Sequence, residues 1–159
     1  MQDYKFRFIT MLAIIMVICA CERENFIPTI KDDKEITTIA GTWKVVSYDD
    51  FAHNTQITKD ADNTWLQINN GDVIMTFMDT LGTKEIEGVT VTNYVSGSYT
   101  ITAPRKIKVL NFNGTYIDQP EWADLFWEKI EESDEFSVNN THLRIFYNAK
   151  RNSITFEKI

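Results

Sequence analysis

The chain has 159 residues, of which 43% are hydrophobic, and its formal net charge is −7. This length suffices for one domain with one hydrophobic core, and the acidic charge argues against nucleic-acid binding, because neutralising phosphates requires a basic surface. The only two cysteines, Cys19 and Cys21, are too close together for an unstrained disulfide and too few for a structural zinc site.

The first 20 residues have the pattern of a secretory signal peptide. Lys5 and Arg7 form a basic start, and the stretch 8–20 carries no charge but is too short to span a bilayer comfortably. Its removal takes away two basic residues and one acidic residue, so the formal charge moves from −7 to −8. The sequence therefore predicts an acidic mature protein that is exported.

The end of this segment, Ile18-Cys19-Ala20-Cys21, resembles the lipobox of bacterial lipoproteins. The resemblance implies that cleavage follows Ala20 and that the Cys21 thiol is acylated, with palmitate as a suitable label. A lipoprotein cysteine carries more than one acyl chain, which gives stable membrane anchoring. The expected location is the bacterial outer membrane, facing the periplasm or the cell surface. The alternatives are an ordinary signal peptide and a true membrane anchor.

Residues 21–35 are mostly charged or polar behind the lipidated position and show no sustained hydrophobic period. This composition predicts a flexible tether, with packing of Phe26, Ile27 and Ile30 on the body as the alternative. Residues 36–159 remain as one domain.

Strand patterns dominate this domain. The stretch 41–49 alternates in the manner of a β-strand, and Asn70-Gly71 lies between two further runs, which predicts a tight hairpin because Asn-Gly adopts positive φ angles readily. Similar short runs continue to residue 112 and resume over 135–159. We predict an all-β fold, an antiparallel up-and-down meander of eight or nine strands that closes into a barrel, because closure removes exposed strand edges.

Residues 118–132 interrupt the strands with a predicted amphipathic helix. Asp118 and Glu121 have the spacing of a capping box, and Pro120 falls in the first turn. At 100° per residue, the apolar stripe covers about 200° of the helix; it consists of Trp122, Ala123, Leu125, Phe126, Trp127 and Ile130. Either the helix closes one end of the barrel, or Trp122 and Trp127 contribute to a docking surface, with Trp127 partly exposed at the stripe's edge.

The stretch 39–46, I-A-G-T-W-K-V-V, resembles the G-x-W opening strand of lipocalins, particularly of the lipocalin-like domains in bacterial lipoproteins. Gly41 and Trp43 match this motif. The resemblance implies a calyx-shaped barrel whose base is closed by Trp43, with a basic residue from a late strand packed over the indole. Arg144 is the first candidate for that residue, and Arg151 and Lys158 are alternatives. About three strands follow the helix where a typical lipocalin has one, which departs from the simple eight-strand count.

A barrel of this size holds either packed side chains or one small apolar ligand. Strand alternation points six residues inward as candidate cavity or ligand positions: Val45, Tyr99, Ile107, Val109, Ile145 and Phe156. The same residues also describe a filled core. The polar connection 52–63 is either a lid over the barrel mouth or an exposed loop.

Little in the sequence supports catalysis or a cofactor. His53 and His142 are far apart, no serine lies in a G-x-S-x-G pattern, and Asp60-x-Asp62 lacks the ligand set of an EF-hand loop. We therefore expect no enzyme, no cofactor and no metal site.

Two functions fit these observations. The first is a lipocalin-like barrel that binds a small apolar or amphiphilic ligand. The second is a non-catalytic interaction module with a filled barrel that docks to another cell-envelope component. A connected interior cavity of about 300 Å³ or more would favour the first, and a filled interior with an exposed aromatic patch would favour the second.

Overall fold

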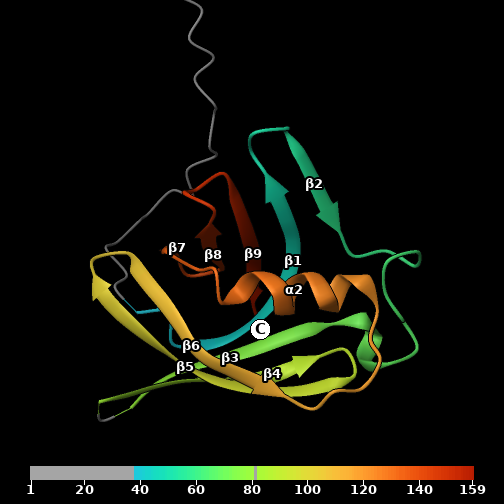
Figure 1. Ribbon diagram of the computed structural model, residues 1–159, viewed down its shortest axis with the longest axis horizontal. Coiled ribbons are helices and arrows are strands. Elements are labelled where there is room, and N and C mark those ends of the chain that lie inside the picture. The colour runs from blue at the N-terminus through green and yellow to red at the C-terminus, as the bar shows by residue number, and fades with distance from the viewer. Residues whose placement is uncertain (1–37, 81) are drawn as a thin grey trace, which may run out of the picture.

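The computed structural model of the protein describes residues 38–80 and 82–159 (Figure 1). In these residues, nine antiparallel strands form one sheet that closes into a ring, and α2 (Glu121–Ile130) is the only α-helix. The predicted signal peptide, Ala20, Cys21 and the tether lie outside the described residues. Over the ranges that the structure describes, no helix combines the length and the apolar character needed to cross a membrane.

The strands follow one another around the ring nearly in chain order. They are β1 (Gly41–Asp50), β2 (Thr55–Thr58), β3 (Val73–Thr80), β4 (Thr83–Thr90), β5 (Asn93–Ala103), β6 (Lys106–Gly114), β7 (Glu135–Val138), β8 (His142–Tyr147) and β9 (Asn152–Lys158). Pairing of β1 with β9 closes the ring, and β2 and β3 both pair with β1, at opposite ends of that strand. The predicted antiparallel meander of eight or nine strands is confirmed.

The predicted Asn-Gly hairpin is wrong. Asn70 and Gly71 do have positive φ angles, but they belong to the short 3₁₀ turn η2 (Asn69–Gly71), and residues 65–68 before it form no strand. Leu66 and Ile68 are exposed, so this run has no buried face to hold it against a sheet. The strand that pairs with β1 in this region is β2, whose four polar or exposed residues gave no hydrophobic signal.

Helix α2 lies across the ring of strands (Figure 1) and packs its apolar side into the barrel. Trp122, Ala123, Phe126 and Ile130 have no exposed surface, so Trp122 is not available for the docking role suggested by the sequence. The Phe126 ring lies 5.9 Å from that of Phe112 on β6 and 6.2 Å from that of Phe156 on β9. The helix therefore joins two strands from different sides of the ring.

The capping box does not form, because the N-cap residue is Pro120 and no side chain caps the helix. Instead, the backbone N–H of Trp122 donates to the carbonyl oxygen of Asn63 at 2.9 Å. A tertiary contact from the loop after β2 thus replaces the predicted local one.

The barrel has a narrow seam between β6 and β7. Only one residue pair, Lys106 with Glu135, is in strand register there. Farther along β6, the backbone N–H of Phe112 donates to the carboxylate of Glu131, at the C-terminal end of α2, at 3.1 Å. The helix end therefore supplies part of the hydrogen bonding that a neighbouring strand would give.

We predict that Phe126→Ala destabilises the protein by about 3–5 kcal/mol, because it removes a fully buried ring that joins β6, β9 and α2. Urea denaturation followed by circular dichroism measures this. Leu66→Ala, at a side chain that is 46% exposed, should change the free energy of unfolding by less than about 0.5 kcal/mol. Equal effects of the two substitutions would contradict the packing described.

The seam predicts a specific loss of stability in acid. Burial opposes ionisation of Glu135, but hydrogen bonds from Lys106 and Lys150 outweigh it and lower the pKa of this carboxyl. Its stabilising contribution is present above the ordinary pKa of 4.5 and is lost as pH falls through the lower folded-state pKa. Urea midpoints measured from pH 7 to pH 3 should fall less steeply for Glu135→Gln than for the unsubstituted protein. The exposed control Glu85→Gln should keep the original slope.

Candidate functional site

The six candidate cavity residues all lie in the barrel core. Val45, Tyr99 and Ile107 are 2% exposed, Val109 is 3% exposed, and Ile145 and Phe156 are fully buried. A cavity able to hold a ligand would leave its lining residues with accessible surface, and these residues have almost none. Their inward orientation follows the predicted alternation, but they contact one another and the helix rather than an interior space.

The base of the barrel carries the G-x-W motif. Gly41 has a φ of +138°, which favours glycine, and the buried Trp43 donates from Nε1 to the carbonyl oxygen of Ile39 at 2.8 Å. The basic group over the Trp43 ring is Lys158 Nζ, 5.4 Å from the ring centroid. The first choice, Arg144, is wrong for this position, since its guanidinium lies 5.9 Å from the centroid of the Phe51 ring.

A buried carboxylate on the opposite side of the sheet is fully used by the fold. Asp49 is 7% exposed, and its oxygens accept hydrogen bonds from Thr155 at 2.7 Å, Ser153 at 3.0 Å and Gln56 at 2.6 Å. Tyr48, the next residue on β1, points the other way and donates to the carbonyl oxygen of Trp122. Asp49 therefore ties β1, β2 and β9 together. Across residues 38–80 and 82–159, no group of three His, Cys, Asp or Glu side chains is placed to hold a metal ion.

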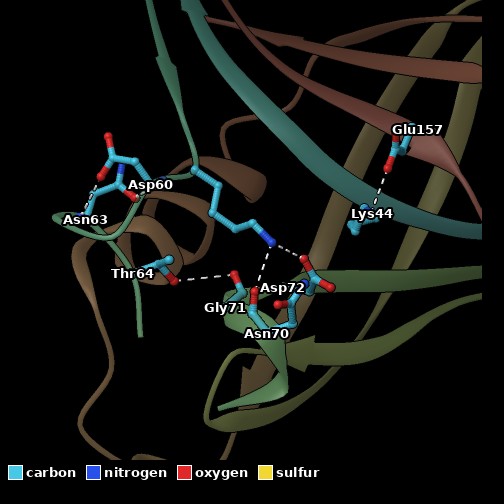
Figure 2. Close-up of polar contacts among 9 residues, drawn as sticks. Lys44, Asp60, Asn63, Thr64, Asn70, Gly71, Asp72 and Glu157 are labelled. Carbon is cyan, nitrogen blue, oxygen red and sulfur yellow. Dashed lines mark hydrogen bonds and ion pairs between the residues drawn. The ribbon is translucent and has the colours of Figure 1, made fainter. Parts of the chain in front are cut away.

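The long connection before β3 is bonded to its surroundings rather than loose (Figure 2). Asn63 accepts through Oδ1 from the backbone of Asp60, and Thr64 donates to the carbonyl oxygen of Gly71 at 3.3 Å. The ammonium group of Lys59 contacts the carboxylate of Asp72 and donates to the Asn70 carbonyl. Across β1 and β9, Lys44 and Glu157 form a further ion pair at 2.7 Å. The bonds of Lys59 and Thr64 hold the loop to residues 70–72, and the bond from the Trp122 N–H to the Asn63 carbonyl places it beside the start of α2.

A surface groove lies between α2 and the segment 115–119 that precedes it, and we call it the aromatic groove. Its volume is about 390 Å³, and it is lined by Asn93, Thr115, Tyr116, Ile117, Asp118, Gln119, Asp124, Trp127 and Glu128. Tyr116 is 85% exposed, and its ring lies 5.8 Å from that of the partly buried Trp127, at an angle of 46°. On its other side Trp127 packs edge-on against Phe112 at 5.6 Å. The groove thus presents two large rings on a fixed support.

Asn93, which is 2% exposed, holds the loop that carries Tyr116. Its Oδ1 accepts from the Thr115 hydroxyl at 3.0 Å and from the Ile117 N–H at 2.7 Å. Its Nδ2 donates to the Ile117 carbonyl at 2.8 Å and to Gln119 Oε1 at 3.0 Å. Because one buried amide makes these bonds, the loop conformation is set before any partner binds.

The turn before Asn93 adopts a costly backbone conformation. Val91 has a φ of +63° although it is β-branched and fully buried. Two hydrogen bonds hold this conformation. The Val91 N–H donates to the Asp72 carbonyl, and Asn69 Nδ2 donates to the Val91 carbonyl. Such residues cost of order 1–3 kcal/mol and cluster at functional sites. Here the strained residue lies two positions from the amide that supports the aromatic groove.

A second, shallow groove of about 600 Å³ adjoins the first and shares Thr115 with it. We call it the adjoining groove, and its other lining residues are Thr76, Glu87, Gly88, Val89, Tyr94, Val95, Ser96 and Gly114. Tyr94 is 74% exposed and donates its backbone N–H to the Thr115 hydroxyl at 3.1 Å.

Sequence reasoning identified Trp127 but missed Tyr94 and Tyr116. Tyr94 lies on β5, where strand alternation predicts which residues are buried and gives no sign that an outward-facing residue binds a partner. Tyr116 lies in a loop, where the sequence has no hydrophobic period. A tyrosine in a polar loop just before an amphipathic helix was the available signal.

The fold is similar to that of two solved structures. One is a DUF4847 family protein from Bacteroides vulgatus, with a TM-score of 0.55 and 18% sequence identity, in a match that covers 74% of this chain and 92% of that one. The other is a protein from Burkholderia xenovorans solved by NMR, with a TM-score of 0.59 and 13% identity, covering 84% of this chain and 99% of that one.

No protein-family model matches the sequence, and no curated protein matches it. At such low identities, the likeness to the two solved structures shows the all-β antiparallel fold alone. The lipocalin resemblance stays a prediction that rests on residues 39–46 and on the order of the predicted elements along the chain.

We predict that Asn93→Ala loosens the loop of the aromatic groove and destabilises the protein by about 1–3 kcal/mol, because it leaves several buried polar groups unpaired. Hydrogen exchange measured by NMR should show a faster rate at the Ile117 amide, which loses its acceptor. Asn113→Ala, at an exposed asparagine whose side chain donates to the nearby Asn111 carbonyl, is the matched control and should leave this rate unchanged. An unchanged Ile117 rate in Asn93→Ala would refute the role given to this amide.

Proposed function

We propose that this protein is a non-catalytic interaction module, anchored by acyl chains on Cys21 to the bacterial outer membrane, that docks to another envelope protein through the aromatic groove. The observation that carries the proposal is the placement of Tyr116 and Trp127. Both rings lie outside a filled barrel, on a loop and a helix face that are held in place by buried contacts. Tyrosine and tryptophan are the residue types that most often dominate binding energy at interfaces.

The packing of the core favours a binding site on the outside of the barrel over one in its interior. Its aromatic rings fill the space between strands and helix, with Phe77 packed 5.6 Å from Tyr99 and 6.4 Å from Phe156. Displacing them for a ligand would sacrifice packing of the kind that costs several kcal/mol per ring. A groove at the rim requires no such rearrangement.

The second candidate is a lipocalin-like barrel that holds a small apolar or amphiphilic ligand. One observation bears on it: among the described residues, Trp122 Nε1 is buried without a hydrogen-bond acceptor. It does not favour an internal site, because an apolar ligand offers no acceptor and the Trp122 side chain has no accessible surface toward an internal space. The exterior site is therefore the better supported proposal.

Site-specific photocrosslinking in the native host tests the proposal. A photoreactive phenylalanine at position 116 should give a discrete adduct with one envelope protein, and the same residue at the exposed control position 66 should not. Trp127→Ala should abolish the adduct while leaving the protein folded. Cys21→Ala should lose incorporated palmitate, leave the membrane fraction and lose the adduct as well. Equal adducts at positions 116 and 66, or a Cys21→Ala chain that stays acylated, would refute the proposal.

A further inference from the structure

We infer that the aromatic groove binds a positively charged side chain, lysine or arginine, presented by an extended segment of a protein partner. The inference rests on the proposed docking function and adds the chemistry of the group that is recognised. It follows from the charge of the lining, from the geometry of the two rings, and from the continuity of the two grooves.

The lining of the two grooves has one sign of charge. Among the residues that the structure describes, four acidic ones line the grooves and no lysine or arginine does. They are Asp118, Asp124 and Glu128 in the aromatic groove and Glu87 in the adjoining groove. A cleft lined by one sign of charge concentrates ligands of the opposite sign. Glu135 of the β6–β7 seam has two basic partners, Lys106 and Lys150. In the aromatic groove Glu128 has one, Lys129, whose Nζ lies 3.8 Å from its carboxylate. The described residues therefore neutralise the acidic lining only in part, and a basic side chain from a partner would complete it.

The helix places two carboxylates beside an aromatic ring. Trp127 and Glu128 follow Asp124 by three and four residues, so Asp124 is a neighbour of both on the surface of α2. One oxygen of Asp124 accepts from Gln119 Nε2 at 2.8 Å, which fixes the carboxylate beside the loop. Glu128 extends into solvent, with 65% of its side chain exposed. A cation over the Trp127 ring would thus have two carboxylates near it, because Asp124 and Glu128 line the same groove.

The tilt between Tyr116 and Trp127 forms an open corner rather than a closed stack. Two rings 5.8 Å apart at 46° expose π-faces to the groove, and a cation within about 6 Å of such a face is attracted to it. Tyr116 is 85% exposed, so much of its ring remains for a partner to cover. An aromatic corner with carboxylates at its rim is chemically suited to an ammonium or guanidinium group on an apolar stem.

The adjoining groove identifies the source of this cation as a peptide segment. A small free amine would occupy only the aromatic groove and leave the second groove, with Val89, Tyr94 and Val95, uncovered. A phospholipid headgroup would bring its phosphate next to carboxylates with no lining cation to neutralise it. An extended chain can place a basic side chain in the first groove and an apolar one in the second, passing over the shared Thr115.

Peptide titration of the full-length chain in a neutral detergent tests the inference. The probe is a capped decapeptide of Gly and Ser that carries one Lys and one Leu three residues apart, and its control has norleucine in place of Lys. In NMR spectra of labelled protein, the Lys peptide should shift the Trp127 indole and Tyr116 amide signals. Its Kd should be about tenfold lower than that of the norleucine peptide. The difference should shrink as salt is raised.

Variants separate charge from shape. The double variant Asp124→Asn with Glu128→Gln should raise the Kd of the Lys peptide about tenfold and leave the Kd of the norleucine peptide unchanged. Glu85→Gln, at an exposed acid on β4 outside both grooves, is the matched control and should change neither. Tyr116→Ala should weaken the binding of both peptides, because it removes the aromatic wall that each of them contacts.

Three results would overturn the inference. Norleucine and Lys peptides that bind equally would make the groove an apolar docking site. Tetramethylammonium alone binding as tightly as the peptide would make it a small-amine site. Phosphatidylethanolamine vesicles, but not the Lys peptide, shifting the same signals would make it a headgroup site. In the first case a crosslink at position 116 would still stand, so a failure of this inference is distinguishable from a failure of the proposed docking function.

Discussion

The contact of Phe126 with Phe112 and Phe156 is the interaction on which the remaining architecture depends. It packs the apolar side of a helix into the ring of strands and so determines what the ring can hold. A nine-stranded antiparallel barrel has room for one small ligand or for side chains, and here the helix supplies the side chains. Because hydrophobic burial is roughly proportional to the apolar area removed from water, filling the interior stabilises a domain of about 120 residues more than an open calyx would.

The same helix also explains the incomplete β6–β7 seam. Where α2 approaches the wall, its C-terminal Glu131 accepts the Phe112 N–H, and strand pairing is reduced to Lys106 and Glu135. Along β6, a contact with the end of α2 thus takes the place of hydrogen bonds that a neighbouring strand would make. At this seam Glu135 pairs with Lys106 across β6 and β7 and with Lys150 in the turn between β8 and β9. Loss of the Glu135 charge in acid removes both pairs, which makes the seam the acid-sensitive part of the barrel.

Sequence patterns predicted most of the fold because period-two alternation directly reports which side of a strand is buried. Val45, Tyr99 and Ile145 point inward as expected, and the stripe on α2 identified the residues that fill the barrel. The patterns failed where tertiary contacts replaced local ones. Asn70-Gly71 adopted positive φ angles in a turn that packs against Thr64, and the start of α2 is capped by Asn63 rather than by Asp118. The four residues of β2 pair with β1 but are all exposed, so the sequence carries no hydrophobic period that would predict this strand.

The site was harder to predict, and the reason is physical. A binding surface consists of residues that the core does not need, so Tyr116 and Tyr94 carry no periodic signal, while the buried amide that positions them, Asn93, looks like an ordinary turn residue in the sequence. The choice between the two Trp residues of α2 shows the same limit. Both belong to one apolar stripe about 200° wide, and only the three-dimensional packing decides that Trp122 is covered on all sides while Trp127 keeps one face open beside Tyr116. A helix that fills a barrel buries the middle of its stripe first, and the stripe's edge, next to the charged face, is where a ring and carboxylates come to lie side by side. Helix α2 therefore has two effects: its buried side fills the barrel, and the edge of its apolar stripe forms one wall of the aromatic groove.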